Sequence, residues 1–382
     1  MRTTRRLMTE WLYHPQAEDW ITLQVEQFIA AMPPARALQA ELASSNTRLV
    51  DWLDHLVLAD SDQASSQLVD LGFEPEQVSA EARDTVYHHP GALCSRVVLR
   101  AETGAEPGSV VAVAIHVEDI NEFLETHQVT ADVTGSPFSP YRWARVWQQD
   151  EHEFLAVERR GHQGFIALDM PPDYILRYLH AFDQWVARPR QFDDMRSGMA
   201  QTLDQTRMLV SEMGANMAAW VALAAECTYW RRRSRTKQQR ARKDKLGLGW
   251  TNQNHYTFRS TRETFGALVQ ILETLGFRSH ERFHAEAEVG WGARVMEQPA
   301  CRMAVFVDLD LQEQGENKLW CSLHGESTLI AGLYHFIGRF DLPETIRQVE
   351  WDVRIRNPFA NLSQVFPQAE RLSVHPGSGR AN

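Results

Sequence analysis

Histidines and glutamates recur at matching places in the two halves of this 382-residue sequence. Each half has an early histidine at the start of a strand-like run, a later histidine at the end of an apolar run, and a glutamate directly before an arginine. The two sets are His55, His116 and Glu158, and His255, His324 and Glu370. Two neutral imidazoles and one carboxylate hold Fe(II) from one side and leave positions open for a bidentate substrate and dioxygen. The pattern predicts an oxygenase site or, with Mn, Ni or Zn, a Lewis acid that polarises a carbonyl.

The sets match because the sequence is internally duplicated. The segment LDHLVLADSDQASSQLVDLGF recurs as QNHYTFRSTRETFGALVQILETLGF, which aligns His55 with His255 and places the same Leu-Gly-Phe at residues 71–73 and 275–277. Further along, VAIHVEDINEFL matches CSLHGESTLIAGL, and QVTADVTGSPF matches QVEWDVRIRNPF. Since order and spacing are kept throughout, we interpret the halves as two copies of one structural unit.

Each copy must position its histidines and glutamate on strands. Apolar runs of strand length surround a helical pattern that ends at Leu-Gly-Phe, so each half predicts two units of one strand, one helix and three strands. We therefore expect an α+β fold with four βαβββ units, paired into two half-open barrels and joined by a long helical segment. The predicted divisions are an N-terminal helical segment, 1–48, a first paired domain, 49–168, a helical region, 169–248, and a second paired domain, 249–382.

The helical region carries a methionine-rich stripe from Met195 to Met217, which is typical of an adaptable core rather than of a cofactor site. It ends in a basic run, residues 231–245, with nine Lys or Arg and one Asp against a net charge of -11 for the chain. The run has no interleaved aromatic residues for base stacking, so a solvated helix face is favoured over contact with nucleic acid.

Composition indicates a soluble protein of a reducing compartment, and we expect a cytoplasmic one. The four cysteines form no CxxC pair, the N-terminus shows no signal-peptide pattern, and no segment is predicted to span a membrane. The sequence also lacks the GxSxG, HExxH, P-loop and GxGxxG motifs of other enzyme classes. The expected partner is a small-molecule substrate, and a homodimer is allowed.

The four units, the DHLVL first strand and the closing VERRGHQGF segment resemble the vicinal oxygen chelate superfamily, which includes glyoxalase I, extradiol dioxygenases and 4-hydroxyphenylpyruvate dioxygenase. The resemblance covers residues 50–165 and 250–375. It implies a half-open barrel with a divalent metal inside, held by histidines and a glutamate on facing strands. His55 and Glu158 match the superfamily pattern, whereas His116 and His324 lie at the end of the strand where the superfamily histidine comes early.

Every candidate also has a structural explanation. His55 could be a hydrogen-bonded buried histidine, Glu158 could pair with the arginines beside it, and His116 and His324 could cap the helices that follow. The second half is ranked slightly ahead because Arg259 shares a strand face with His255 and could clamp a substrate carboxylate. The leading hypothesis is a non-haem Fe(II) dioxygenase for a small carboxylate or 2-oxo acid. The alternative is a binding or scaffold protein that kept the fold without the metal.

Overall fold

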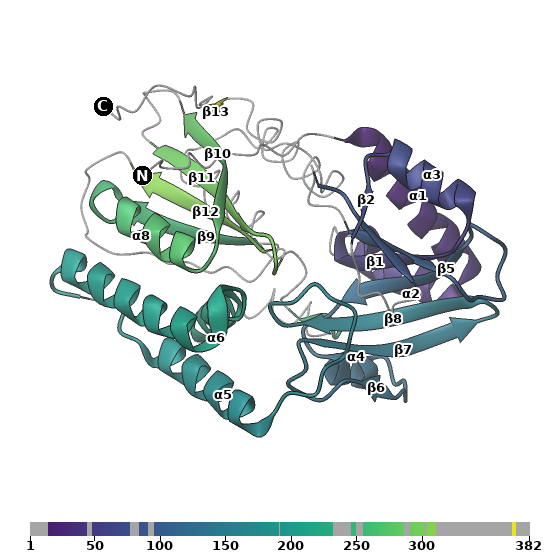
Figure 1. Cartoon of the computed structure of the whole chain (residues 1–382), viewed down its shortest axis with the longest axis horizontal. Helices are drawn as coiled ribbons and strands as arrows, with labels where there is room; N and C mark the ends of the chain where they lie inside the picture. The colour runs from purple at the N-terminus through teal and green to yellow at the C-terminus, as the bar shows by residue number, and fades with distance from the viewer. Residues whose placement is uncertain are drawn as a thin grey trace.

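The chain forms two β-sheets, each packed against its own layer of helices (Figure 1). The computed structural model describes residues 14–43, 48–76, 84–90, 95–190, 192–231, 246–249, 255–285, 291–301, 303–310 and 369–371. The predicted fold class is confirmed for the first half, and one βαβββ unit of the second half is described. Residues 311–368, which would contain most of the fourth unit, lie outside the described part.

The first sheet has eight strands in the order β2-β3-β4-β1-β5-β8-β7-β6. They are β1 (Leu53–Ala59), β2 (Glu74–Pro75), β3 (Thr85–His88), β4 (Arg96–Arg100), β5 (Val110–His116), β6 (Val133–Thr134), β7 (Tyr141–Gln149) and β8 (His152–Arg159). Strands β1 and β5 are antiparallel neighbours at the centre, and each pairs in parallel with the last strand of its own unit. The sheet is therefore two βαβββ units joined through their first strands.

Helices cover one face of this sheet. They are α1 (Pro15–Ala31), α2 (Pro33–Ala43), the short 3-10 helix η1 (Leu49–Trp52), α3 (Asp62–Asp70) and α4 (Ile120–Thr126). Phe28 of α1 packs on Phe154 of β8 with the ring centroids 6.4 Å apart, and both side chains are fully buried. The N-terminal helices thus belong to the core of the first half, as the sequence indicates.

The second sheet has five strands in the order β13-β10-β11-β12-β9. They are β9 (His255–Thr261), β10 (Arg278–Ala285), β11 (Trp291–Gln298), β12 (Met303–Asp310) and β13 (Ala369–Arg371). Helix α8 (Arg262–Thr274) follows β9, and β9 pairs in parallel with β12. Strands β9 to β12 repeat the order found in β1 to β4, which confirms that the duplication extends to the fold.

The Leu-Gly-Phe motif makes the same turn in both halves. Gly72 and Gly276 have φ angles of +90° and +86°, a backbone region that glycine adopts without a steric penalty. After α3, the amide of Phe73 donates to the carbonyl of Leu68. After α8, Phe277 donates to Leu272 in the same way. This pattern satisfies the last carbonyls of each helix and buries the phenylalanine that follows.

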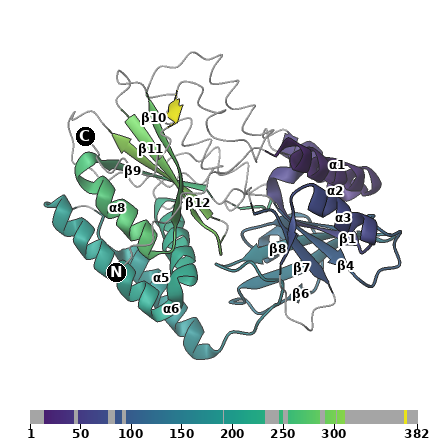
Figure 2. The ribbon, with the colours of Figure 1, turned by 45° about the horizontal axis from the view of Figure 1, so that its top comes forward.

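The helical region between the halves packs on the second sheet (Figure 2). It consists of α5 (Pro172–Ala187) and α6 (Met195–Arg231). Met195 and Met199 are buried and Met217 is partly buried, so the methionine stripe is core, as expected. Residues 232–245, nearly all of the basic run, lie outside the described residues.

Helix α6 meets the length and composition criteria for a membrane span, with a mean hydropathy of 1.3 over its most apolar window. Gly214, however, has φ +74° and ψ +158°, which breaks the helix into two segments. In the second segment, Ala218, Ala222 and Ala225 are fully buried in the core shared with α8. We therefore interpret α6 as a broken core helix.

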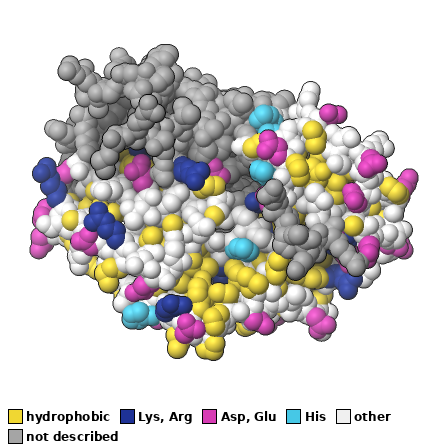
Figure 3. Space-filling model, viewed as in Figure 1, with side chains coloured by type: hydrophobic (Ala, Val, Ile, Leu, Met, Phe, Trp, Pro, Cys, Tyr) yellow, Lys and Arg dark blue, Asp and Glu magenta, His cyan; other side chains and the backbone are white. Residues whose placement is uncertain are grey.

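Apolar side chains are exposed along α5. Leu176 and Leu179 are 68% and 42% exposed, and Ile166 and Leu168 in the preceding segment are also exposed. In Figure 3, hydrophobic side chains gather along the lower edge of the view, where Figure 1 places α5. Helix α5 therefore faces the second half with one side only.

Candidate functional site

The two faces of the first sheet have different roles. Alternate residues of β1 and β5, such as Leu56, Leu58 and Val113, pack against the helices. The intervening residues, such as Val57 and Ala112, form a second cluster on the opposite face, which we call the inner face. The inner face is where the superfamily resemblance places a metal.

A buried ion pair lies at one end of the inner face, beside His55. Asp54 accepts hydrogen bonds from two guanidinium nitrogens of Arg159: Nε lies 2.6 Å from Oδ2, and Nη2 lies 2.9 Å from Oδ1. The Nδ1 of His55 lies 2.6 Å from Asp54 Oδ1. All three side chains are buried, with relative exposures of 3% to 7%. A register shift in β1 between Leu53 and His55 accompanies this arrangement.

The electrostatics of the cluster favour charged Asp54 and neutral His55. Burial alone would raise the pKa of Asp54, but the charge of Arg159 and the hydrogen bonds from His55 and Arg159 hold this pKa well below its usual value. Burial lowers the pKa of His55, against the opposing effect of Asp54. A neutral His55 therefore donates its Nδ1 proton to Asp54, while Arg159 neutralises the carboxylate.

The protein's own aromatic side chains cover this cluster. The ring of Phe165 lies edge-on to His55 at a centroid distance of 4.8 Å. The guanidinium carbon of Arg159 lies 4.6 Å from the ring centroid of Tyr141 and 4.9 Å from that of Phe165. Phe165 belongs to the segment after β8, and Arg159 fixes that segment by donating to the carbonyl of Gly164 at 2.7 Å. Side chains of the same half, Phe165 and Tyr141, therefore cover the inner face beside His55 and Arg159.

His116 lies on the same face as His55. It ends β5, shares a face with Ala112 and Ala114, and is 8% exposed. Ala114 is registered opposite His55, so the two histidines are diagonal neighbours on adjacent strands. His116 is not the cap of the following helix, because the side chain of Asp119 accepts the first amide hydrogen bonds of α4.

Glu158 lies on the other face of the sheet. Along β8 it has the same parity as Phe154 and Ala156, which pack against the helices. Its Oε1 accepts a hydrogen bond from the amide of Ile120, at the start of α4, at 2.8 Å. Arg142 donates to both of its oxygens at 2.8 and 2.9 Å, and Arg160 donates to Oε2 at 2.7 Å. The carboxylate is therefore part of an arginine cluster, as in the structural explanation from the sequence.

The first half does not fit a metal at the predicted set. The structure brings His55 and His116 together but places Glu158 behind the sheet, and the charged group nearest to His55 beyond Asp54 is the cation Arg159. Within the described ranges, no three His, Cys, Asp or Glu side chains gather to hold a metal ion. Among the described residues, Asp54 and Glu158 are instead engaged in ion pairs with arginines.

In the second half, His255 occupies the place of His55. It is the first residue of β9, the strand that pairs in parallel with the last strand of its unit, as β1 does. Phe258 of β9 is buried against the helices. Along β9, His255 and Arg259 have the opposite parity to Phe258, as His55 and Ala59 have to Leu58 on β1.

Residues at equivalent positions of the two inner faces differ in polarity. After its histidine, β1 has Val57 and Ala59, whereas β9 has Thr257 and Arg259. Ala59 is registered beside Arg100, and Arg259 is registered beside an acidic residue, Asp308. At these two positions β9 therefore has polar residues where β1 has apolar ones. On the neighbouring strands the difference is reversed, because β4 has Arg96 and Val98 where β12 has Ala304 and Phe306.

The other members of the second set are only partly located. Glu370 lies on β13, registered opposite His284 of β10, at the far edge of the sheet from β9. His255 is registered with Ala304 at the other end of the strands, so Glu370 and His255 occupy opposite corners of the described sheet. His324 lies outside the described residues, so the structure does not assemble the second set.

Two residues of the first cluster were not singled out from the sequence. Asp54 and Arg159 stand beside His55 and Glu158, but they are separated by 105 positions along the chain. The available signal was strand alternation: on β8, Arg159 shares a face with Leu155 and Val157, whereas Glu158 shares one with Phe154. Applying this parity would have placed Arg159, and not Glu158, on the inner face.

Among known proteins, no family model and no curated protein sequence matches the chain. Similar solved structures include a glyoxalase/bleomycin resistance protein/dioxygenase superfamily member from Vibrio splendidus 12B01, 16% identical, covering 27% of this chain and 94% of that chain at a TM-score of 0.20. A mutant of glyoxalase I from Zea mays is 10% identical, with coverages of 67% and 68% and a TM-score of 0.22. The Mn(II)-bound glyoxalase from Novosphingobium aromaticivorans is 10% identical, with coverages of 72% and 86% and a TM-score of 0.21.

At these scores and identities the alignments support no conclusion about activity, metal or substrate. The strand order shows that two βαβββ units meet through β1 and β5 and form one mixed sheet. This confirms, for the first half, the paired arrangement of units that the sequence predicts.

Proposed function

We propose that this protein is a metal-dependent enzyme of the vicinal oxygen chelate type, and that its site lies on the inner face of the second sheet. The observation that carries the proposal is the contrast between Val57 and Ala59 on β1 and Thr257 and Arg259 on β9, at equivalent positions of duplicated units. A duplicated protein can keep its chemistry in one copy, and the filled inner face of the first half leaves the second copy for that role.

His255 is the residue we assign first as a metal ligand, with His324 as the second. Glu370 is the carboxylate implied by the resemblance. Because β13 lies at the opposite corner of the sheet, Glu326 is the substitute that we would test beside it. Fe(II) is the metal we favour, since this donor set suits the activation of dioxygen beside a bidentate substrate. The substrate class is a small carboxylate or 2-oxo acid, held by the guanidinium of Arg259.

The test is anaerobic Fe(II) loading of tag-free protein, followed by removal of free metal and measurement of the bound metal. We expect about one metal per chain in the wild type and at least about a tenfold weaker affinity in His255→Ala, since removing a ligand costs more than disturbing its supporting shell. His180→Ala is the control, an exposed histidine of α5, and should bind like the wild type. Metal retained by His255→Ala would refute the assignment.

A second candidate function is a small-molecule-binding or scaffold protein without a metal. It is favoured by the ion pairs that engage Glu158 and Asp54 in the first half. A wild type that binds neither Fe(II) nor Mn(II) with defined stoichiometry would support this candidate over the enzyme.

A further inference from the structure

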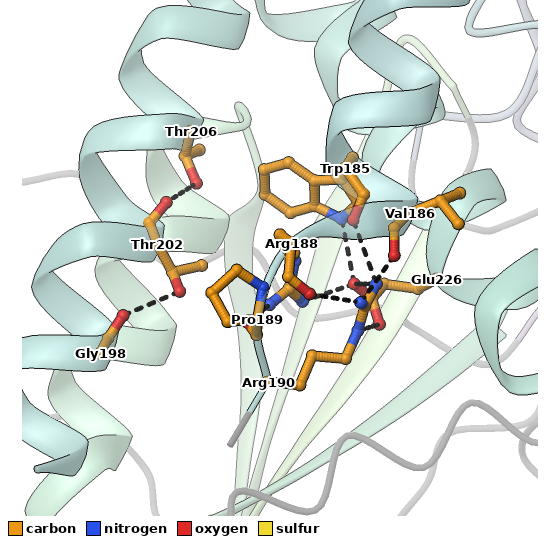
Figure 4. Close-up of polar contacts among 9 residues, drawn as sticks. All are labelled: Trp185, Val186, Arg188, Pro189, Arg190, Gly198, Thr202, Thr206 and Glu226. Atoms are coloured by element: carbon orange, nitrogen blue, oxygen red, sulfur yellow. Dashed lines mark hydrogen bonds and ion pairs between the residues drawn. The ribbon is translucent and has the colours of Figure 1, made fainter. Parts of the chain in front are cut away.

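A second buried polar cluster lies where α5 and α6 meet, on the helix side of the second sheet (Figure 4). Its centre is Glu226 of α6, which is 2% exposed. Arg188 donates to Glu226 Oε1, and Arg190 donates to the same oxygen at 2.8 Å and to Oε2 at 3.2 Å. Trp185 adds a third contact, from its indole Nε1 to Oε1 at 3.0 Å. All of these groups come from the end of α5 or from α6.

The two arginines of this cluster are not equally occupied. Arg190 also donates to the carbonyls of Val186, Arg188 and Trp185 at 2.9 to 3.2 Å, and its guanidinium carbon lies 3.6 Å from the ring centroid of Tyr229. Arg188 contacts Glu226, the carbonyl of Pro189 at 3.5 Å and the ring of Trp185, whose centroid lies 4.9 Å from the guanidinium carbon. Its buried Nε has no hydrogen-bond partner in the described structure. The spare donors of the cluster therefore belong to Arg188.

The charges of the cluster do not balance. Among the residues that the structure describes, two guanidinium groups with side-chain exposures of 4% and 5% pair with a single carboxylate, which leaves one positive charge in excess within the described cluster. An uncompensated buried charge is costly, and a protein that keeps one usually supplies it with a counter-charge. An anion beside Arg188 would restore neutrality.

Arg188 also lines a cavity with apolar walls. The space between the side chains is about 430 Å³, part of it open to solvent, and water centres can occupy about 30 Å³ of it, so any occupant must be small. Its apolar walls come from the helices and from β9, and they include Met199, Ala222, Phe258, Leu268 and Leu272. Two polar side chains besides Arg188 also line it, Thr202 and the paired Glu226. A hydrated inorganic anion would gain nothing from these walls, whereas a short hydrocarbon chain would.

We propose that this cavity binds a small monocarboxylate, with the carboxylate on Arg188 and a short apolar chain between α6 and α8. The fork of N–H donors on an arginine matches the two oxygens of a carboxylate, and the walls supply the burial for the chain. The site is distinct from the inner face, because Phe258 lines the cavity from the side of β9 that faces the helices. It does not depend on the proposed metal chemistry.

The experiment is calorimetric titration of the full chain with butyrate, using n-butanol and inorganic phosphate as the two half-probes. We expect saturable binding of butyrate and at least about tenfold weaker binding of each half-probe, since butanol lacks the charge and phosphate lacks the chain. The cavity variants are Arg188→Lys, which keeps the charge but loses the fork, and Ala222→Leu, which fills the apolar end. Arg177→Met, an exposed arginine of α5 paired with Asp173, is the matched control.

Butyrate binding that weakens about tenfold in both cavity variants and is unchanged in Arg177→Met supports the proposal. Thermal unfolding with and without butyrate provides a second measurement, because a ligand of the folded state raises the melting temperature and the two variants should lose that shift. Equal binding of phosphate and butyrate, unchanged binding in Ala222→Leu, or no binding of butyrate to the wild type would each overturn it. In the last case, the cluster only fastens α5 to α6.

Discussion

Strands β1 and β9 are copies of one element, and they have been used differently. Both begin their βαβββ units, carry a histidine at the same register, and lead to a helix closed by the same Leu-Gly-Phe turn. Around His55 the inner face is filled by Asp54, Arg159 and Phe165. Along β9 the equivalent positions carry polar residues. The comparison teaches that equivalent positions of a duplicated fold can differ in polarity, so the ion pair that surrounds the histidine of one copy does not define the surroundings of the other.

The largest effect should come from removing the cation of the first inner face. Arg159→Met leaves the buried carboxylate of Asp54 without its partner, and we expect a loss of about 3–5 kcal/mol in the free energy of unfolding. Urea denaturation followed by circular dichroism measures this loss. The control is Arg207→Met, an exposed arginine on α6 paired with Asp204, which should change stability by no more than about 0.5 kcal/mol. Similar values for the two variants would mean that Asp54 and Arg159 do not hold the first half together.

A smaller effect is expected at Glu158. Glu158→Gln keeps the shape of the side chain but removes the charge that binds Arg142 and Arg160, so stability should fall by about 2 kcal/mol. Because Glu158 lies on the helix side of the sheet, the metal content of the loaded protein should not change. A loss of bound metal in this variant, at normal stability, would contradict the placement of Glu158 and return the site to the first half.

The smallest effect should be a dependence of stability on pH. Burial lowers the pKa of His55 below its ordinary value of 6.5, so the unfolded chain binds a proton there that the folded chain does not. The stability that comes from keeping His55 neutral is complete above about pH 6.5, and it is lost as the pH falls toward the lowered pKa of His55 in the folded state. Asp54, whose pKa is also depressed, adds a loss only below its ordinary value of 3.8.

Denaturation at a series of pH values from 7.5 down to 5 measures this dependence. His55→Gln, which can still donate a hydrogen bond to Asp54, should flatten the slope in this window. His180→Gln, at an exposed position of α5, should leave the slope as in the wild type. An unchanged slope in His55→Gln would show that His55 is not a buried neutral histidine.

Much of the fold could be predicted from the sequence, because the patterns that indicate its strands, helices and turns lie within short segments of the chain. Apolar periodicity predicts the strand at His55 and the helix after it. A glycine suited to a left-handed turn marks the end of that helix at Gly72 and of its second copy at Gly276. The βαβββ order then follows from repetition. The break of α6 at Gly214 is less evident, since an isolated glycine does not by itself reveal whether a helix bends or ends.

The site was less predictable because it depends on distant pairings. The sequence shows Glu158 beside Arg159 but does not say which of them faces His55, and the structure gives that place to Arg159. The position of Glu370 against His284 at the far edge of the second sheet depends on a strand pairing across a long stretch of chain. Aligning the two halves selected residue types that can bind a metal. It did not use the alternation along β8, which decides whether Glu158 or Arg159 lies on the inner face of the sheet.

The most direct test of the division between the halves is to measure bound Fe(II) and the free energy of unfolding on the same samples of His55→Ala and His255→Ala. The predicted result is a crossed one. His55→Ala should lose about 1–3 kcal/mol of stability, because Asp54 loses a buried partner, and should keep its metal. His255→Ala should keep its stability and lose its metal. Metal lost from His55→Ala and retained in His255→Ala would contradict the assignment of the site to the second half.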